Sequence, residues 1–206
     1  MEQLYHIHIN NRFDDQFVEG NTIHTGDEPN TFRHAFLNRS CTFVEKTVID
    51  EQGREGNYRR DILDFFTPEK IRTLPVDKQL EVLLAARQYI QNSKVDFREI
   101  ILEDVRRELY PQYPSRYSCF WLTDKDSLPF WEDMLKTKER SHQIFEVEPQ
   151  GKIFVSTDDL LPECHHPHNM QYEEAIRYWD PKPSDLEKNT REYLFEGKLT
   201  LTKRVK

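Results

Sequence analysis

Alternation of apolar and polar positions at the start of the chain predicts a strand. Residues 4–9 read Leu-Tyr-His-Ile-His-Ile, and their period of two places alternate side chains on opposite sides. One side is apolar, and the other carries the imidazoles of His6 and His8. Residues 10–31, rich in Asn, Asp, Gly and Thr, then read as a long irregular loop. Loops of this length inside a compact domain are usually functional.

Helical periodicity appears in two later segments, residues 77–91 after Pro75 and residues 96–109 before Pro111. The first segment repeats apolar side chains at Leu80, Leu83, Leu84 and Ile90. The second repeats them at Ile100, Ile101, Val105 and Leu109. The spacing predicts two consecutive helices.

The second half of the chain alternates short apolar runs with turn residues. We expect a strand at 118–122, a short helix at 125–135 and a helix at 171–179 that prolines end. Two hairpins are expected, one pairing 144–148 with 152–155 and the other pairing 192–195 with 198–202. Regular βαβ alternation, GxGxxG and GxxxxGK[ST] are all absent from the sequence. The pattern predicts an α+β fold and argues against Rossmann and P-loop sites.

Composition narrows the class further. With 206 residues and 36% hydrophobic content, one core and one domain suffice. The net charge of −8 restricts any nucleic-acid contact to local basic stretches, of which 98–107 and 203–206 are the candidates. No stretch resembles a signal peptide or a membrane span, and three widely separated cysteines argue against a disulfide framework. We therefore expect a soluble cytoplasmic protein that does not interact with membranes.

Four motifs in order carry a family resemblance: residues 4–8, 17–23, 114–121 and 190–197. They resemble the ADP-ribosyltransferase superfamily, particularly the DarT-type toxins that modify nucleic acids and the uncharacterised bacterial families grouped with them. The resemblance implies a split, mainly antiparallel β core in a single domain 1–206, with helices inserted at about 67–110. It also implies NAD as co-substrate and transfer of ADP-ribose to a macromolecule, RNA, DNA or protein, with an antitoxin partner if the protein is a toxin in a toxin–antitoxin or phage-defence system.

The resemblance assigns a role to residues in each motif. His6 matches the position that binds the ribose near nicotinamide, and His8 stands where Ser or Thr is commoner. In the second motif, Gly20 and Asn21 would let the backbone approach the dinucleotide. The third motif contributes candidate NAD ligands, with an Arg fork for the pyrophosphate and an aromatic ring for nicotinamide, at Arg116, Tyr117 and Ser118.

Glu192 in the fourth motif matches the catalytic glutamate of the superfamily. A carboxylate there can bind the ribose 2′-hydroxyl, stabilise positive charge as nicotinamide leaves, and help to deprotonate the acceptor. The whole interpretation requires Glu192 and His6, from opposite ends of the chain, to line one cleft.

Two other readings remain open. The ligand types of a zinc site stand together at Cys164, His166 and His168, with acidic residues nearby. Such a site would suit a metal-dependent hydrolase. The sequence contains no second ligand pair, however, and we expect no metal. The chain could also be a noncatalytic binding module on the same fold. Such a module would give no NAD-dependent thermal shift.

Overall fold

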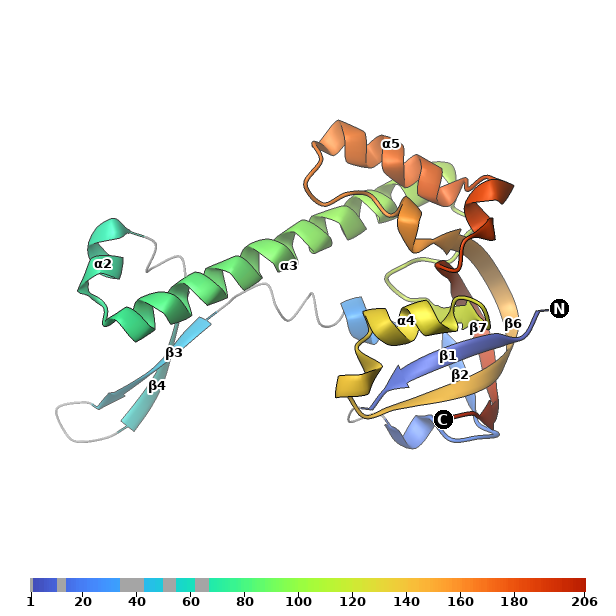
Figure 1. Ribbon diagram of the computed structural model, residues 1–206, viewed down its shortest axis with the longest axis horizontal. Coiled ribbons are helices and arrows are strands. Elements are labelled where there is room, and N and C mark those ends of the chain that lie inside the picture. The colour runs from blue at the N-terminus through green and yellow to red at the C-terminus, as the bar shows by residue number, and fades with distance from the viewer. Residues whose placement is uncertain (1, 11–13, 34–42, 50–54, 62–66) are drawn as a thin grey trace. The chain divides into compact units, whose positions relative to one another are not determined.

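The computed structural model describes residues 2–10, 14–33, 43–49, 55–61 and 67–206 (Figure 1). The chain divides into two compact units, one of residues 1–33 with 98–206 and the other of residues 34–97. The predicted single domain with a helical insertion stays a prediction. In the described parts of the chain, no helix is long and apolar enough to cross a membrane.

The first unit is built on a five-stranded antiparallel sheet with the order β2-β7-β5-β1-β6. Its strands are β1 (Leu4–Ile9), β2 (Thr22–Thr25), β5 (Phe120–Asp124), β6 (His142–Thr157) and β7 (Arg191–Arg204). β6 also pairs with β7, so the strand order closes on itself (Figure 1). The first and last strands of the chain, β1 and β7, therefore belong to the same sheet. The predicted α+β class is confirmed.

Both predicted hairpins are wrong, because β6 and β7 run straight through their turn signals. The register places Gly151 opposite Gly197, so the two glycines meet at one point in the sheet. Gly197 has a φ of +139°, and a Cβ there would lie 2.5 Å from the carbonyl oxygen of Gln150. A Cβ on Gly151 would collide with the carbonyl of Glu196. Glycine serves here for close approach of two long strands rather than for chain reversal.

Apolar residues fill both faces of this sheet. One cluster is formed by Leu4, Phe17, Ile23, Leu122, Phe145, Val147, Phe195, Leu199 and Leu201. On the other face, the C-terminal part of α3 (Val76–Leu109) and α5 (His168–Trp179) pack together against the strands (Figure 1). That cluster contains Ile101, Leu102, Val105, Cys119, Phe154, Ala175, Tyr178, Trp179 and Leu194. The two helices thereby bring their side chains close to the start of β7.

The two predicted helices form one continuous helix, α3, because residues 92–95 contain neither Pro nor Gly to end the first. The expected apolar face is also partly wrong. Ile100 and Leu109 are exposed, and Leu102, outside the expected set, is fully buried. In the preceding part of α3 the expected positions Leu80, Leu83, Leu84 and Ile90 are exposed, whereas Val82 and Ala86, which complete the expected apolar set, are buried.

Two short elements, β5 and α4 (Leu128–Met134), fall near their predicted places, whereas η1 (Asp14–Gln16) and β2 lie inside residues 10–31, which were expected to be an irregular loop. β5 begins two residues later than expected, and α4 lies inside the helix predicted at 125–135. Like η1, short 3₁₀ turns are η3 (Thr137–Glu139), η4 (Asp158–Leu160) and η5 (Pro183–Glu187). In the second unit, β3 (Phe43–Ile49) pairs antiparallel with β4 (Glu55–Asp61), and α2 (Pro68–Thr73) precedes α3.

Candidate functional site

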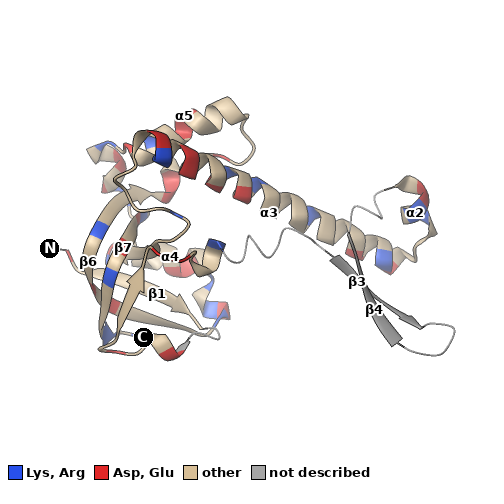
Figure 2. Cartoon of the chain, turned by 180° about the vertical axis from the view of Figure 1, so that it is seen from behind, with Lys and Arg blue, Asp and Glu red and all other residues tan. Residues whose placement is uncertain are grey.

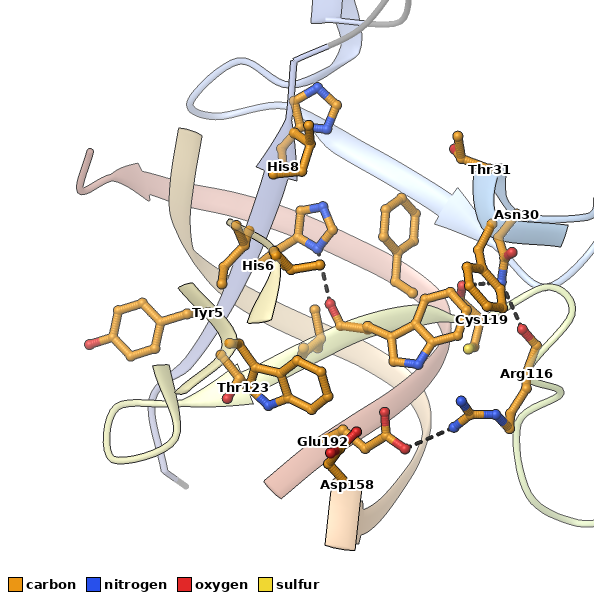
Figure 3. A pocket seen from close by; sticks show the side chains of 18 of the residues that line it. Tyr5, His6, His8, Asn30, Thr31, Arg116, Cys119, Thr123, Asp158 and Glu192 are labelled. Atoms are coloured by element: carbon orange, nitrogen blue, oxygen red, sulfur yellow. Dashed lines mark hydrogen bonds and ion pairs between the residues drawn. The ribbon is translucent and has the colours of Figure 1, made fainter. Parts of the chain in front are cut away.

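A cavity of about 500 Å³ opens in the first unit (Figure 3). Four of the sequence-predicted site residues line it: His6, His8, Arg116 and Glu192. β1 contributes the two histidines and β7 contributes the glutamate, so that the two ends of the chain meet at one site. The volume lies within the range of small-molecule and cofactor sites.

The start of β7 is held rigidly next to Glu192. Arg191 forms an ion pair with the fully buried Asp124, and its backbone N–H donates to Ser127 Oγ at 3.1 Å. The indole N–H of Trp131 donates to the Arg191 carbonyl at 2.7 Å. Anchoring the preceding residue at three points fixes where the Glu192 side chain leaves the strand.

Glu192 is oriented by a buried network of polar side chains. Nη1 of Arg116 donates to Glu192 Oε1 at 2.8 Å, and the phenol of Tyr178 donates to the same oxygen at 2.6 Å. On its other side, Nε of Arg116 donates to Glu99 Oε2 at 2.7 Å. All four residues are at most 4% exposed. A buried arginine is therefore shared between two glutamates from different elements, α3 and β7.

Charge and burial fix the protonation states of this network. Burial works to lower the pKa of Arg116, but Glu99, Tyr178 and Glu192 hold it well above its usual value. Burial likewise works to raise the pKa of Glu99, and the Arg116 guanidinium outweighs it and lowers that pKa. Burial raises the pKa of the Tyr178 phenol well above its ordinary value, so the hydroxyl stays a donor. The network stays in one arrangement at neutral pH.

One oxygen of Glu192 remains available to a ligand. Its Oε1 accepts both hydrogen bonds, whereas its Oε2 has no hydrogen-bond partner within the described residues. Asp158 lies beside Glu192 in the cavity wall (Figure 3). Arg98, also in the wall, donates from Nη2 to Glu99 at 3.1 Å, and its buried Nε has no partner among the residues described. The cavity lining thus contains two carboxylates and two arginines, Arg98 and Arg116.

His6 supplies a neutral acceptor. Its Nδ1 lies 3.0 Å from the Trp121 carbonyl oxygen, and because a carbonyl only accepts, Nδ1 carries the proton. Burial lowers the pKa of His6 to about 4, so the ring is uncharged at neutral pH. Nε2 is then a lone-pair acceptor, and it has no hydrogen-bond partner within the described part of the chain. His8 stacks on Phe17 with ring centroids 3.6 Å apart.

Several aromatic side chains also line the cavity, among them Phe17, Phe32, Phe120, Trp121 and Trp131. Such a wall suits a flat heteroaromatic ring. Cys119 also lines the cavity, but burial raises the pKa of its thiol well above the ordinary value, so the protonated thiol is a poor nucleophile. The chemistry of the site therefore rests on its carboxylates and its imidazole.

The third motif is a turn rather than the start of a strand. The backbone N–H groups of Ser118 and Cys119 both donate to the Ser115 carbonyl, and β5 begins only at Phe120. The turn directs its three candidate side chains to different places. Arg116 enters the buried network, Tyr117 lies under the Arg33 guanidinium at 4.0 Å, and Ser118 Oγ donates to Glu196 at 3.0 Å. Tyr117 and Ser118 lie outside the cavity lining.

Gly20 and Asn21 also lie outside the cavity lining, at exposed positions. The backbone N–H of Gly20 donates to the Leu201 carbonyl at 2.7 Å, and the carbonyl of Asn21 accepts from Leu201 at 2.9 Å. Gly20 lies in the turn that leads into β2 and has a φ of +86°, a conformation that favours glycine. These two residues join the loop to β7 and do not reach His6 or Glu192.

Comparison with protein families places the chain. Residues 4–206 match the family model DUF2441, described as a protein of unknown function. The chain belongs to the DUF2441 family. No curated protein matches it. The match includes the strands of both His6 and Glu192.

Sequence reasoning missed three residues that build this DUF2441 site. Glu99 and Tyr178 hold Arg116 and Glu192, and Asn30 Nδ2 donates to the carbonyls of Arg116 and Cys119 at 2.9 and 3.0 Å. A signal for Glu99 was present, because Glu99, Leu102 and Glu103 share the i, i+3, i+4 spacing of one helix face. Acidic residues on the buried face of a helix require a partner.

The described residues of the DUF2441 chain provide no set of ligands for the zinc site considered above. Within the described residues, no three His, Cys, Asp or Glu side chains come together as a metal would need. Nδ1 of His166 instead lies 2.7 Å from Glu174 on α5. The basic stretch at 98–107 is also neutralised locally, because Arg98 pairs with Glu99, and Arg106 and Arg107 pair with Glu103. Basic and acidic positions are interspersed along α3 (Figure 2). The stretch offers no cluster of unpaired cations to a phosphate backbone.

Proposed function

We propose that this DUF2441 chain is an NAD-dependent ADP-ribosyltransferase with Glu192 as its catalytic carboxylate. The observation that carries the proposal is the meeting of His6 and Glu192 in one cavity, since the family resemblance requires these two residues to line one cleft. The split antiparallel β core of the superfamily belongs to the same proposal.

The hydrogen-bonding groups and flat surfaces of the cavity fit the nicotinamide riboside half of NAD. Hydroxyl groups of a ribose donate hydrogen bonds, and the cavity offers them Oε2 of Glu192 and Nε2 of His6 as acceptors. Trp121 and Phe120 supply flat apolar surface for the nicotinamide ring. Arg98 is the candidate cation for the pyrophosphate, because Arg116 is already shared between two glutamates.

Glu192 would act through charge. Held by Arg116 and Tyr178, its carboxylate can stabilise the positive charge that develops on the ribose as nicotinamide leaves. His6, uncharged and fixed on β1, would orient the ribose without adding charge of the wrong sign. The acceptor is a macromolecule, RNA, DNA or protein, and an antitoxin would accompany a toxin role.

The test uses the full chain with isotope-labelled NAD and a cell extract. We expect label on a nucleic acid or a protein, release of nicotinamide, and an NAD-dependent thermal shift. Glu192→Gln should abolish transfer, while Glu173→Gln, an exposed carboxylate on α5, should transfer like the wild type. Absence of NAD binding and of labelled product with the wild-type chain would reject the proposal in favour of a noncatalytic binding module.

A further inference from the structure

We propose that Asp158 is the general base of this site, taking the proton from the acceptor nucleophile while Glu192 binds the ribose. The inference rests on the proposed function and divides between two carboxylates the work that the family resemblance gives to Glu192 alone. It is carried by the different surroundings of the two carboxylates in one cavity (Figure 3).

Asp158 is placed beside Glu192 by the backbone. It is the first residue of η4, directly after β6, and its backbone N–H donates to the Thr190 carbonyl at 3.0 Å. Thr190 lies two residues before Glu192, so one hydrogen bond ties the start of η4 to the start of β7. The next residue, Asp159, turns away and forms an ion pair with Lys188 at 3.0 Å.

The two carboxylates differ in what holds them. Oε1 of Glu192 accepts hydrogen bonds from Arg116 and Tyr178, and its side chain is 3% exposed. The Asp158 carboxylate has no hydrogen bond or ion pair to any described residue, and Asp158 is partly exposed at the cavity wall. A general base must reach the incoming nucleophile, and the partly exposed Asp158 carboxylate, which no described residue holds by a hydrogen bond, suits this role better than the buried Glu192 side chain.

The charges around Asp158 support the same division. Burial and then the Glu192 carboxylate raise the pKa of Asp158, and Asp159 acts in the same direction. Arg98 on α3 and Arg116 in the turn before β5 act to lower it, without cancelling the rise. A carboxylate whose pKa is raised by its surroundings is suited to acid–base work beside a second carboxylate that acts through its charge.

The proposed step is balanced without any further reactant. The acceptor nucleophile, an O–H or N–H group, forms a bond to C1 of the nicotinamide-bearing ribose. The bond from that carbon to the nicotinamide nitrogen breaks, and its electron pair leaves with the ring, which becomes neutral. The proton of the nucleophile passes to the Asp158 carboxylate and then to water. No oxidation or reduction takes place.

The test compares Asp158→Asn with Asp159→Asn, a neighbouring carboxylate outside the cavity lining. We expect Asp158→Asn to slow transfer by about 100-fold or more and to remove the acid limb of the pH–rate profile, as loss of a general base does. Its NAD dissociation constant, measured by calorimetry, should stay within about threefold of the wild type, because the lost group acts on the acceptor. Asp159→Asn should keep the wild-type NAD affinity and the wild-type rate at neutral pH, with the acid limb retained but moved to lower pH because one charge that raises the pKa of Asp158 is gone.

A second variant separates catalysis from folding. Asp158→Ala should regain part of its transfer rate when formate is added, since a small carboxylate can occupy the vacated space. Transfer by Asp158→Asn at the wild-type rate, or a loss of NAD affinity equal to its loss of rate, would overturn the assignment. If Glu192→Gln abolishes transfer while Asp158→Asn does not, the proposed function stands and this inference fails.

Discussion

The phenol of Tyr178 donates a 2.6 Å hydrogen bond to Oε1 of Glu192 and accepts a 2.6 Å hydrogen bond from Nη1 of Arg116. The hydroxyl thus closes a triangle with the ion pair between Arg116 and Glu192. Because Tyr178 is fully buried on α5, the helix sets the direction of a side chain that belongs to β7. Orientation of Glu192 is therefore a property of packing between a helix and the sheet.

Removing this hydroxyl should weaken catalysis more than binding. We expect Tyr178→Phe to lower kcat for ADP-ribosyl transfer roughly tenfold, the equivalent of one lost hydrogen bond of about 1.4 kcal/mol, with little change in KM for NAD. The matched control is Tyr172→Phe, because that hydroxyl donates to Glu108 at an exposed site on the same helix. Steady-state kinetics on both variants measures the effect. An equal change in both would show that the triangle has no part in rate.

Removing the shared cation should cost stability. Arg116→Ala leaves Glu192 buried without a charged partner and Glu99 with Arg98 alone, so we expect the free energy of unfolding to fall by about 3–5 kcal/mol. Arg107→Ala breaks an ion pair with Glu103 whose arginine side chain is 63% exposed, and should cost less than about 1 kcal/mol. Urea unfolding followed by circular dichroism gives both values. Similar losses for the two variants would contradict the buried network.

The sequence predicts the elements of this fold better than their lengths. Period-two alternation located β1 to the residue, and helical spacing located α5 within three residues of its start. Gly151 and Gly197 misled the prediction because glycine permits both a turn and a close approach of two strands. Which of these a glycine serves depends on a partner strand more than forty residues away in the chain.

The site divides in a similar way. His6, Arg116 and Glu192 were named from their motifs, and all three line the cavity. The spacing in α3 indicates that Glu99 is buried, but the contacts of Glu99 and Tyr178 with Arg116 arise only when α3 and α5 pack on the same face of the sheet. Residue identity locates groups that would touch a ligand, whereas the groups that hold them in place depend on tertiary packing.

The meeting of the two glycines gives a test of the long strands. Gly197→Ala would place a Cβ 2.5 Å from the Gln150 carbonyl oxygen at a φ of +139°, so we expect a loss of about 2–4 kcal/mol in unfolding free energy. Gly20→Ala is the matched control, because its φ is +86° and a Cβ there meets no atom within 4 Å. Backbone strain alone should cost it about 1 kcal/mol. Thermal unfolding of both variants measures the difference, and equal losses would argue against close approach at Gly197.

Burial of His6 should make stability depend on pH. Its pKa falls from 6.5 to about 4, chiefly through burial, with the Trp121 carbonyl opposing and His8 adding to the shift. Between these two values the unfolded chain binds a proton that the folded chain does not, so stability is present above pH 6.5 and is lost as the pH falls toward 4. A shift of this size corresponds to roughly 3 kcal/mol.

The contribution of His6 can be separated from that of the acidic residues by comparing variants. His6→Gln keeps a side-chain donor for the Trp121 carbonyl but cannot take up a proton. It should be less stable than the wild type at pH 7. The gap in unfolding free energy between the two proteins should narrow by roughly 3 kcal/mol as the pH approaches 4, because only the wild type is destabilised by protonation of the unfolded chain. His24→Gln, at an exposed position on β2, is the matched control for removing one imidazole. Urea unfolding at half-unit pH steps provides the curves, and NMR titration of the His6 ring carbons gives the proton uptake directly. A constant gap for His6→Gln would mean that burial leaves the pKa of His6 at 6.5, and the ring would then become charged below that pH and lose the acceptor that the proposed ribose contact needs.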